Sequence, residues 1–162
     1  FFCVTSLDTK SELVQRYKAE EILKSLKAKG AAVLHGIDCE KFLGSSNERN
    51  KYKIIEETDF DAIVFQFPHT NGGKMKISHQ RNLLESFFGN CSHLLRKHSN
   101  DISPAKVDHR EVIVTLAKGQ GGTSMDGSHL RKLGNSWQIV EMAARAGLVL
   151  KDARLFEDNE WS

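Results

Sequence analysis

A short apolar segment that ends in a proline and a histidine constrains the fold of this chain more than any other feature. Residues 60–67 read Phe-Asp-Ala-Ile-Val-Phe-Gln-Phe, with little polar alternation, as expected of a strand covered on both faces. Pro68 cannot donate to a sheet ladder, so we expect the strand to end there. His69 follows directly, and the carboxyl ends of strands are where open α/β sheets bind ligands. The segment therefore predicts a parallel sheet with His69 at its ligand-binding edge.

Strand-like and helix-like segments alternate along the chain. We expect strands at residues 1–7, 31–38, 60–67, 111–117 and 148–156, and helices at 9–30, 48–55, 78–97 and 135–147. Thr9 and Glu12 have the spacing of a capping box at the start of the first helix. The longest helix carries an apolar stripe made of Leu83, Leu84, Phe87, Phe88, Cys91, Leu94 and Leu95. This alternation predicts a doubly wound, mostly parallel sheet of the α/β class.

The size and composition of the chain narrow the class of protein. A chain of 162 residues is the size of one domain, and 40% hydrophobic with 27% charged residues is ordinary for a soluble globular protein. It has neither a bilayer-length apolar run nor a signal segment, so we expect no membrane insertion. Its three cysteines are an odd number without a close pair, which is typical of a reducing, intracellular compartment. Because Phe1 already begins a strand-like segment, we expect residues 1–162 to be a partial domain of a longer protein.

Two acidic residues, Asp8 and Asp38, follow successive predicted strands and are expected at the same sheet edge. An acid in this position often accepts hydrogen bonds from the ribose hydroxyls of a nucleotide, and a second acid can meet an adenine amine. The alternative is that Asp8 caps a helix and Asp38 stabilises a turn. Spacing alone favours this structural alternative.

A glycine-rich segment follows the predicted strand at residues 111–117. Residues 118–123, Lys-Gly-Gln-Gly-Gly-Thr, look like a phosphate cradle but match neither the dinucleotide fingerprint nor the P-loop. One interpretation is a mobile surface loop. The other is a lid over the sheet edge, with Lys118, Asn135 and Trp137 facing a bound substrate.

Basic residues gather in three places, two of which adjoin the expected ligand edge. The clusters are Lys74, Lys76, His79 and Arg81, then Arg96, Lys97 and His98, and finally Arg131 and Lys132. Such clusters are usually solvated faces, but they also suit contact with a nucleic-acid backbone. Trp137 would then stack on a base, or it belongs to the core. The histidine and cysteine spacings fit no zinc site, and no nucleophile motif supports covalent hydrolysis.

The order of these motifs resembles the large-subunit rRNA (uridine-N3) methyltransferase-like domain family. The resemblance is closest to animal members, in which this domain precedes a ferredoxin-fold anticodon-binding domain. The Phe-Pro-His element at residues 67–69 and the Asn-Ser-Trp element at residues 135–137 are its most specific parts. The other matching segments are residues 33–38, 60–66, 83–88, 92–95, 118–123 and 143–148.

The resemblance implies a Rossmann-like fold that binds S-adenosylmethionine and methylates an RNA base, in rRNA or tRNA. It implies that Asp8 contacts the cofactor's ribose and Asp38 its adenine, with Phe67 and Pro68 beside the methyl donor. The substrate side would include Lys74, Lys118, Asn135 and Trp137. His69 would either remove the uridine N3 proton or shape its loop by hydrogen bonding. The implied location is the nucleolus, the nucleus or the cytoplasm.

The chain departs from the family pattern at three points. It has Gln66 where the family commonly has Asn, it lacks the first strand with its glycine loop, and it stops before the last strand. We therefore expect either a gap or a direct, rearranged pairing between the strands at residues 1–7 and 60–67, because the missing strand lies between them. We also expect weak or no S-adenosylmethionine binding, and no activity, from this chain alone.

Two other functions remain open at this stage. One is an RNA-binding module that has lost catalysis and accompanies an anticodon-binding domain. The other is a small-nucleotide oxidoreductase on the same architecture, which the Phe-Pro-His element disfavours.

Overall fold

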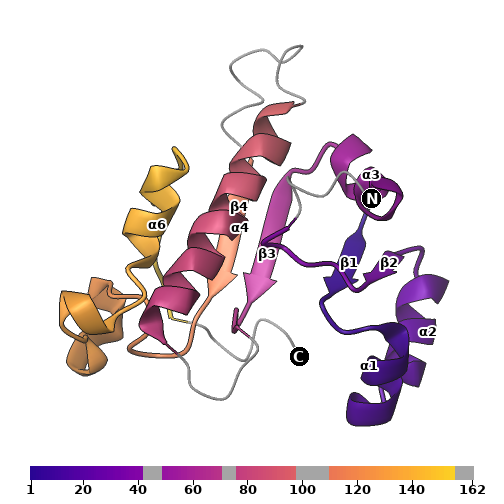
Figure 1. Ribbon diagram of the computed structural model, residues 1–162, viewed down its shortest axis with the longest axis horizontal. Helices are drawn as coiled ribbons and strands as arrows, with labels where there is room; N and C mark the ends of the chain where they lie inside the picture. The colour runs from indigo at the N-terminus through magenta and orange to yellow at the C-terminus, as the bar shows by residue number, and fades with distance from the viewer. Residues whose placement is uncertain (42–48, 71–75, 98–109, 156–162) are drawn as a thin grey trace. The chain divides into compact units, whose positions relative to one another are not determined.

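A computed structural model describes residues 1–41, 49–70, 76–97 and 110–155 (Figure 1). The chain divides into two compact units, Phe1–Thr58 and Asp59–Ser162, each of which is described by itself. Both units are built from short parallel strands and helices, so the expected α/β class is confirmed.

The first unit places two parallel strands beside helices. Strand β1 (Cys3–Ser6) pairs with β2 (Ala32–His35) in parallel, with Ser6 opposite His35 at the carboxyl end. The connection contains α1 (Lys10–Tyr17) and α2 (Glu20–Ala28), and α3 (Arg49–Glu57) follows β2. The predicted capping box is confirmed, since Glu12 Oε2 accepts a hydrogen bond from the Thr9 backbone N–H at 2.8 Å.

The first predicted helix is in fact two helices. Lys18 lies at a φ of 52°, in the left-handed region, and its N–H bonds back to the carbonyl groups of Leu13 and Val14. A residue in this conformation ends a helix, so α2 begins anew at Glu20. The predicted helix over residues 9–30 is therefore wrong in its continuity.

The second unit is a strand–helix–strand arrangement with an appended helix. Strand β3 (Ala62–Gln66) pairs in parallel with β4 (Glu111–Thr115), and α4 (Ile77–Lys97) lies between them in the sequence. Two 3₁₀ helices, η3 (Ser124–His129) and η4 (Leu133–Asn135), precede α6 (Ile139–Arg145), which packs against α4.

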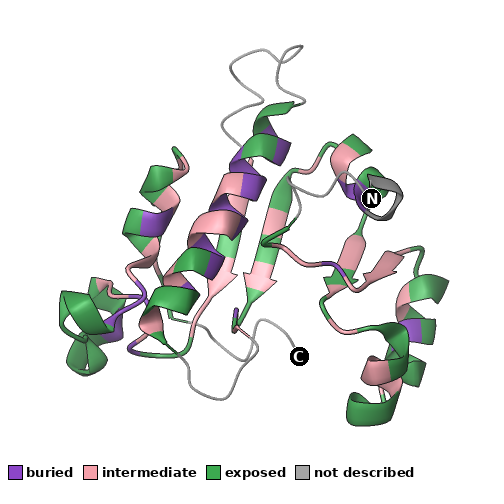
Figure 2. Cartoon of the chain, viewed as in Figure 1, coloured by how far each residue is buried: buried purple, intermediate pink, exposed green. Residues whose placement is uncertain are grey.

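The core of the second unit is the apolar stripe of α4. All seven residues of the predicted stripe are buried, and Leu84 has no exposed surface. Figure 2 shows the buried positions recurring along one side of α4, as its 3.6-residue period requires. Arg110, whose side chain is 8% exposed, bonds to the Leu95 carbonyl and pairs with Asp59 at 2.6 Å, and so joins the end of α4 to the start of the β3 segment.

Two expectations about the strands are wrong. Exposed and half-buried residues alternate along β3, and Val64 is 52% exposed, so this strand is covered on one face rather than two. Residues 148–155 form no strand, and Val149 is 91% exposed. Among the described residues the ladders form a two-stranded sheet in each unit, and one doubly wound sheet stays a prediction. The gap and the direct pairing between β1 and β3 both stay predictions, because these strands belong to different units.

No helix in the described ranges combines the length and the apolar character that crossing a bilayer requires.

The burial of α4 predicts unequal effects of two leucine truncations. Leu84→Ala removes a side chain with no exposed surface and should lower the free energy of unfolding by about 2–5 kcal/mol, because it leaves a cavity. Leu133→Ala is the matched control, since Leu133 is 69% exposed and should change stability by less than about 0.5 kcal/mol. Urea unfolding followed by circular dichroism measures both values. Equal effects of the two substitutions would show that α4 does not carry the core.

Candidate functional site

The carboxyl end of β3 holds a residue in an uncommon backbone conformation. Phe67 has a φ of 50°, although its N–H still continues the ladder to the Thr115 carbonyl at 2.9 Å. A bulky residue in the left-handed region is strained and persists only where its surroundings fix it. Pro68, which is buried, follows it and turns the chain so that the Phe67 ring stays half-exposed.

His69 is exposed beside this turn and rests against a buried tryptophan. The rings of His69 and Trp137 lie 5.5 Å apart, edge to face at 86°. Trp137 is 3% exposed, and its backbone N–H bonds to the Gln120 carbonyl at 2.7 Å. Trp137 therefore packs against the imidazole of His69. Because its indole is buried, it has no exposed ring face on which an RNA base could stack in this conformation. Its expected contact with substrate stays a prediction.

Gln80, on the first turns of α4, fixes the residue after His69. Its amide nitrogen donates to Thr70 Oγ1 at 2.8 Å, and its side chain has no exposed surface. Within the described ranges, its Oε1 is buried without a hydrogen-bond partner. The role of Gln80 was missed from the sequence. The signal for it is its position one helical turn before Leu83 and Leu84, which places a polar residue in line with the apolar stripe.

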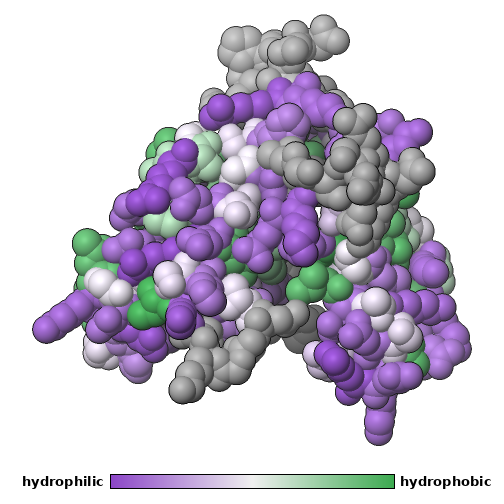
Figure 3. Space-filling model, in the orientation of Figure 1, coloured by the Kyte–Doolittle hydropathy of each residue, from purple (hydrophilic) through white to green (hydrophobic). Residues whose placement is uncertain are grey.

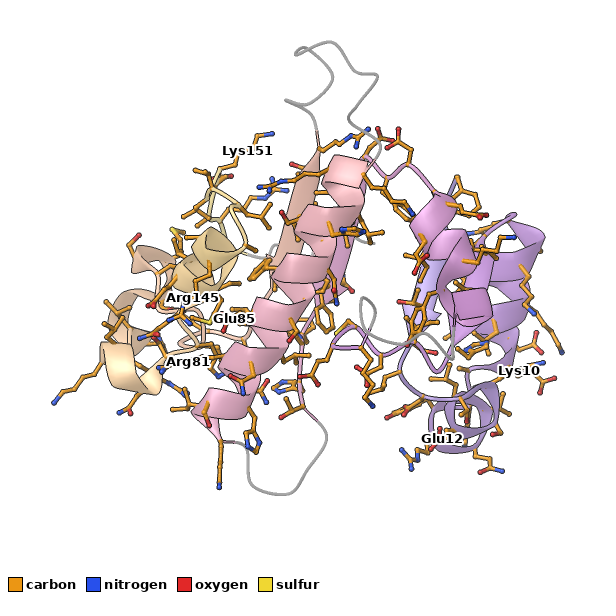
Figure 4. All side chains as sticks on the ribbon, turned by 45° about the horizontal axis from the view of Figure 1, so that its top comes forward. Lys10, Glu12, Arg81, Glu85, Arg145 and Lys151 are labelled. Atoms are coloured by element: carbon orange, nitrogen blue, oxygen red, sulfur yellow. The ribbon has the colours of Figure 1, made fainter. Side chains whose placement is uncertain are left out.

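Arg81 holds the segment in front of α6 in place rather than facing solvent. Its guanidinium donates to the carbonyl oxygen of Ser136 at 3.1 and 2.7 Å and to those of Leu133 and Gly134 at 3.0 Å. Figure 4 shows Arg81 reaching from α4 toward that segment. The Nε and one terminal nitrogen of Arg81 are thus committed to backbone carbonyls, and its contact with a phosphate stays a prediction.

The glycine-rich loop is organised around a carboxylate from its own chain. Asp126 is 7% exposed, and its two oxygens accept hydrogen bonds from the backbone N–H groups of Gly119 at 2.8 Å, Gly122 at 2.8 Å and Thr123 at 3.1 Å. Successive backbone N–H groups form an anion-binding concavity. In this loop that concavity holds Asp126, so the loop does not present an empty phosphate cradle. Sequence reasoning missed Asp126, although its spacing of three residues from Thr123 is that of a helix cap.

Gly122 brings this loop against the Asn-Ser-Trp element. Its φ is +76°, and a Cβ built on it would lie 2.5 Å from Ser136 Oγ. Ser136 has no exposed surface, whereas the side chains of Lys118 and Asn135 are exposed. The loop and residues 135–137 are therefore packed as one structure, which carries Trp137 to His69. Lys74, the remaining predicted substrate residue, lies outside the described residues.

In the first unit, Asp8 and Asp38 both follow the carboxyl ends of neighbouring parallel strands, as predicted. Asp38 makes a turn, since one oxygen accepts from the Glu40 N–H at 3.0 Å and the other pairs with Lys41 at 3.0 Å. Asp8 is not the helix cap, because Thr9 is. Its side chain is 25% exposed, and one of its oxygens lies 3.9 Å from the Arg16 guanidinium. Arg16 is its ion-pair partner within the described part of the chain.

His35 and Cys39 flank Asp38 but are held in uncharged forms. Burial, together with the charges of Lys27 and Lys10, lowers the pKa of His35, whose Nδ1 lies 3.1 Å from Ser6 Oγ. Burial and the neighbouring carboxylate of Asp38 raise the pKa of Cys39 to about 12, which suppresses the reactive thiolate. Across the described ranges, no three metal-ligating side chains gather in one place.

The geometry thus joins Phe67, Pro68, His69 and Trp137 in the second unit, and Asp8 with Asp38 in the first. The convergence of all of them on one ligand stays a prediction.

Comparison with known proteins shows which family the sequence matches. The family described as rRNA (uridine-N3-)-methyltransferase BTM5-like matches residues 2–162. The chain is 38% identical over 134 residues, 83% of its length, to the ferredoxin-fold anticodon-binding domain-containing protein 1 homolog of Mus musculus. It is 36% identical over 152 residues, 94% of its length, to ferredoxin-fold anticodon-binding domain-containing protein 1 of Homo sapiens.

A plant relative extends the comparison. The chain is 31% identical over 166 aligned positions, 98% of its length, to heavy metal-associated isoprenylated plant protein 41 of Arabidopsis thaliana. The chain spans 18% of the mouse relative, 21% of the human relative and 26% of the plant relative. No solved structure matches it.

Two glycines with nearly equal positive φ values test the packing of the loop on Ser136. Gly122→Ala should lower the free energy of unfolding by about 3 kcal/mol, because its Cβ both strains a positive φ and meets Ser136 Oγ. Gly30→Ala, at a φ of +80° with nothing within 4 Å, carries only the backbone strain of about 1 kcal/mol. Urea unfolding of both variants gives the difference. A Gly30→Ala variant as unstable as Gly122→Ala would contradict the close packing.

The lowered pKa of His35 predicts that acid weakens the first unit. The unfolded chain binds this proton more readily than the folded chain does. The stabilisation is therefore present above the ordinary value of 6.5 and is lost as pH falls through the lower, folded pKa. Hydrogen exchange of the β1 and β2 amides, measured relative to the intrinsic exchange rate, should speed up as pH falls below 6.5. His35→Gln should abolish this dependence and His93→Gln, an exposed control, should keep it; the reverse result would exclude His35 as its source.

Proposed function

This chain belongs to the family of rRNA (uridine-N3-)-methyltransferase BTM5-like proteins, and from that premise we propose that its natural protein methylates N3 of a uridine in rRNA with S-adenosylmethionine. The observation that supports the proposal most is the family match over residues 2–162. The relatives are several times longer than this chain, so the activity is proposed for the complete natural protein that contains it.

The carboxyl ends of β1 and β2 suit the nucleoside end of the cofactor. The Asp8 side chain is three-quarters buried, and its interaction among the described residues is the ion pair with Arg16. Its oxygens can therefore accept hydrogen bonds from ribose hydroxyls. Asp38 pairs with Lys41, which is 73% exposed, and exposed ion pairs of this kind exchange at small cost. Asp38 is therefore free to accept an adenine amine. Bound S-adenosylmethionine would supply an electrophilic methyl group on its sulfonium.

The carboxyl end of β3 suits the methyl end and the base. Phe67 offers a half-exposed ring, which can lie against the cofactor or the target base, and Pro68 fixes its direction. In methylation of uridine N3, the new N–CH₃ bond replaces an N–H bond, so a group on the protein must take the proton. His69 is exposed, held on Trp137 and of the residue type that accepts a proton near neutral pH. We assign it as the general base.

The second candidate function is RNA binding without catalysis. The names of the mouse and human relatives specify an anticodon-binding domain, which favours tRNA as a partner of those proteins. In this alternative, His69 only shapes the loop after β3. An rRNA or tRNA substrate would place the protein in the nucleolus, the nucleus or the cytoplasm.

The proposal predicts a methylation activity that depends on the His69 imidazole. The complete protein, incubated with labelled S-adenosylmethionine and total RNA, should label rRNA at uridine N3. His69→Ala should lower the rate of methyl transfer by about 100-fold or more, as loss of a general base does. His93→Ala, an exposed histidine on the far part of α4, should react at the parental rate.

Two results would contradict these assignments in different ways. Absence of label in RNA with the unmodified protein overturns the methyltransferase proposal and favours the binding module. Full activity of His69→Ala, or restoration of activity by His69→Gln, overturns the general base, because an amide can hold the loop by hydrogen bonding but cannot take the proton.

A further inference from the structure

Four cationic or protonatable side chains gather where the glycine-rich loop meets the segment after η3. Lys118, His129, Arg131 and Lys132 are all exposed. A Cβ on Gly119 would lie 3.3 Å from the His129 Cβ and 3.6 Å from the Arg131 Nε, so the segment folds back onto the start of the loop. Lys118, the neighbour of Gly119, therefore shares one surface with His129 and Arg131. We name Lys118 and residues 129–133 the basic patch.

The charge of the basic patch is not neutralised by its surroundings. Asp126 is the one acidic residue between positions 112 and 140 of the sequence. Its carboxylate points inward onto the N–H groups of Gly119, Gly122 and Thr123 and is 7% exposed. The acid that folds the loop is thus removed from the surface, and the cations are left facing water.

Several other cations in the described part of the chain are paired with carboxylates, whereas those of the basic patch are not. Lys24 bonds to Glu21 at 2.9 Å, and Arg145 bonds to Glu141 at 2.8 Å and reaches Glu85 at 3.4 Å (Figure 4). Within the described part of the chain, Lys118, Arg131 and Lys132 form no such pair. Unpaired, exposed cations are the kind that release counterions when they meet phosphates.

Apolar side chains are interleaved with the cations. Leu130 is 55% exposed and Leu133 is 69% exposed, on either side of Arg131 and Lys132. Figure 3 shows hydrophobic residues set among hydrophilic ones at the lower left, where Figure 1 places this segment. Single-stranded RNA presents the matching chemistry, with phosphates along the backbone and splayed bases whose faces are apolar.

We propose that the basic patch is the surface that holds a single-stranded stretch of the RNA, with Lys118, Arg131 and Lys132 on phosphates and the two leucines against bases. The identity of the partner rests on the proposed function. The position is consistent with that function, because the same packed loop carries Trp137 and hence supports His69.

A pair of double variants with equal change of charge tests the proposal. Arg131→Gln with Lys132→Gln removes two charges from the basic patch, and Lys27→Gln with Lys29→Gln removes two exposed charges from around the end of α2. Binding of the chain to a labelled single-stranded RNA is measured by fluorescence anisotropy between 50 and 200 mM KCl, conditions chosen for the steep salt dependence of phosphate contacts. Circular dichroism checks that each variant is folded. If the double variant of the basic patch does not fold, Lys118→Gln serves as the second patch variant.

The patch variant should bind about tenfold more weakly at the lowest salt. Its plot of log K against log [salt] should flatten by about 1.4, which is roughly 0.7 for each single-strand phosphate that the variant no longer neutralises. The control variant should bind as the unmodified chain does. Failure of the unmodified chain to bind RNA, or equal binding by patch and control variants, overturns the proposal. Because this assay needs no methyl transfer, RNA binding through the patch without methylation by the complete protein would count against the proposed function alone.

Discussion

The buried carboxylate of Asp126 is the interaction on which the rest of the candidate site depends. A carboxylate that is 7% exposed is costly unless its charge is met, and three backbone N–H groups meet it here. Its bonds fix the glycine-rich loop, whose carbonyl groups at Gln120 and Gly121 accept the N–H groups of Trp137 and Ile139. The indole held in this way supports His69. The same carboxylate, by turning inward, leaves the basic patch without a compensating surface charge, so one acid serves both the placement of the histidine and the proposed contact with RNA.

The two units contribute different parts of the proposed chemistry. The first supplies acids at the carboxyl ends of β1 and β2, which suit a nucleoside, and the second supplies a strained Phe67 and an exposed imidazole at the carboxyl end of β3. Within the described residues each unit has a two-stranded sheet, and small sheets of this kind gain their stability from the helices packed on them. In the second unit that helix is α4, whose apolar stripe is the core.

Features that depend on spacing within one element could be predicted from the sequence, whereas features that depend on contacts between distant segments could not. The capping box of Thr9 with Glu12, the stripe of α4 and the four observed strands follow from spacing within one element, and all were predicted. The break at Lys18 was not, because a lysine carries no signal for a left-handed φ. Residues 148–155 have strand-like composition, but a strand also needs a partner for its backbone groups. The role of Asp126 depends on how the loop folds back, which spacing does not encode, and that is why the loop first looked like a phosphate cradle or a mobile segment.

The central proposal is that the whole protein to which this chain belongs transfers a methyl group to uridine N3 of an rRNA. The most direct measurement is mass spectrometry of nucleosides from purified rRNA of cells that lack the protein, set beside rRNA of the parental cells. The account predicts that N3-methyluridine falls at one position and returns when the unmodified gene is restored. Unchanged N3-methyluridine at every position would contradict it.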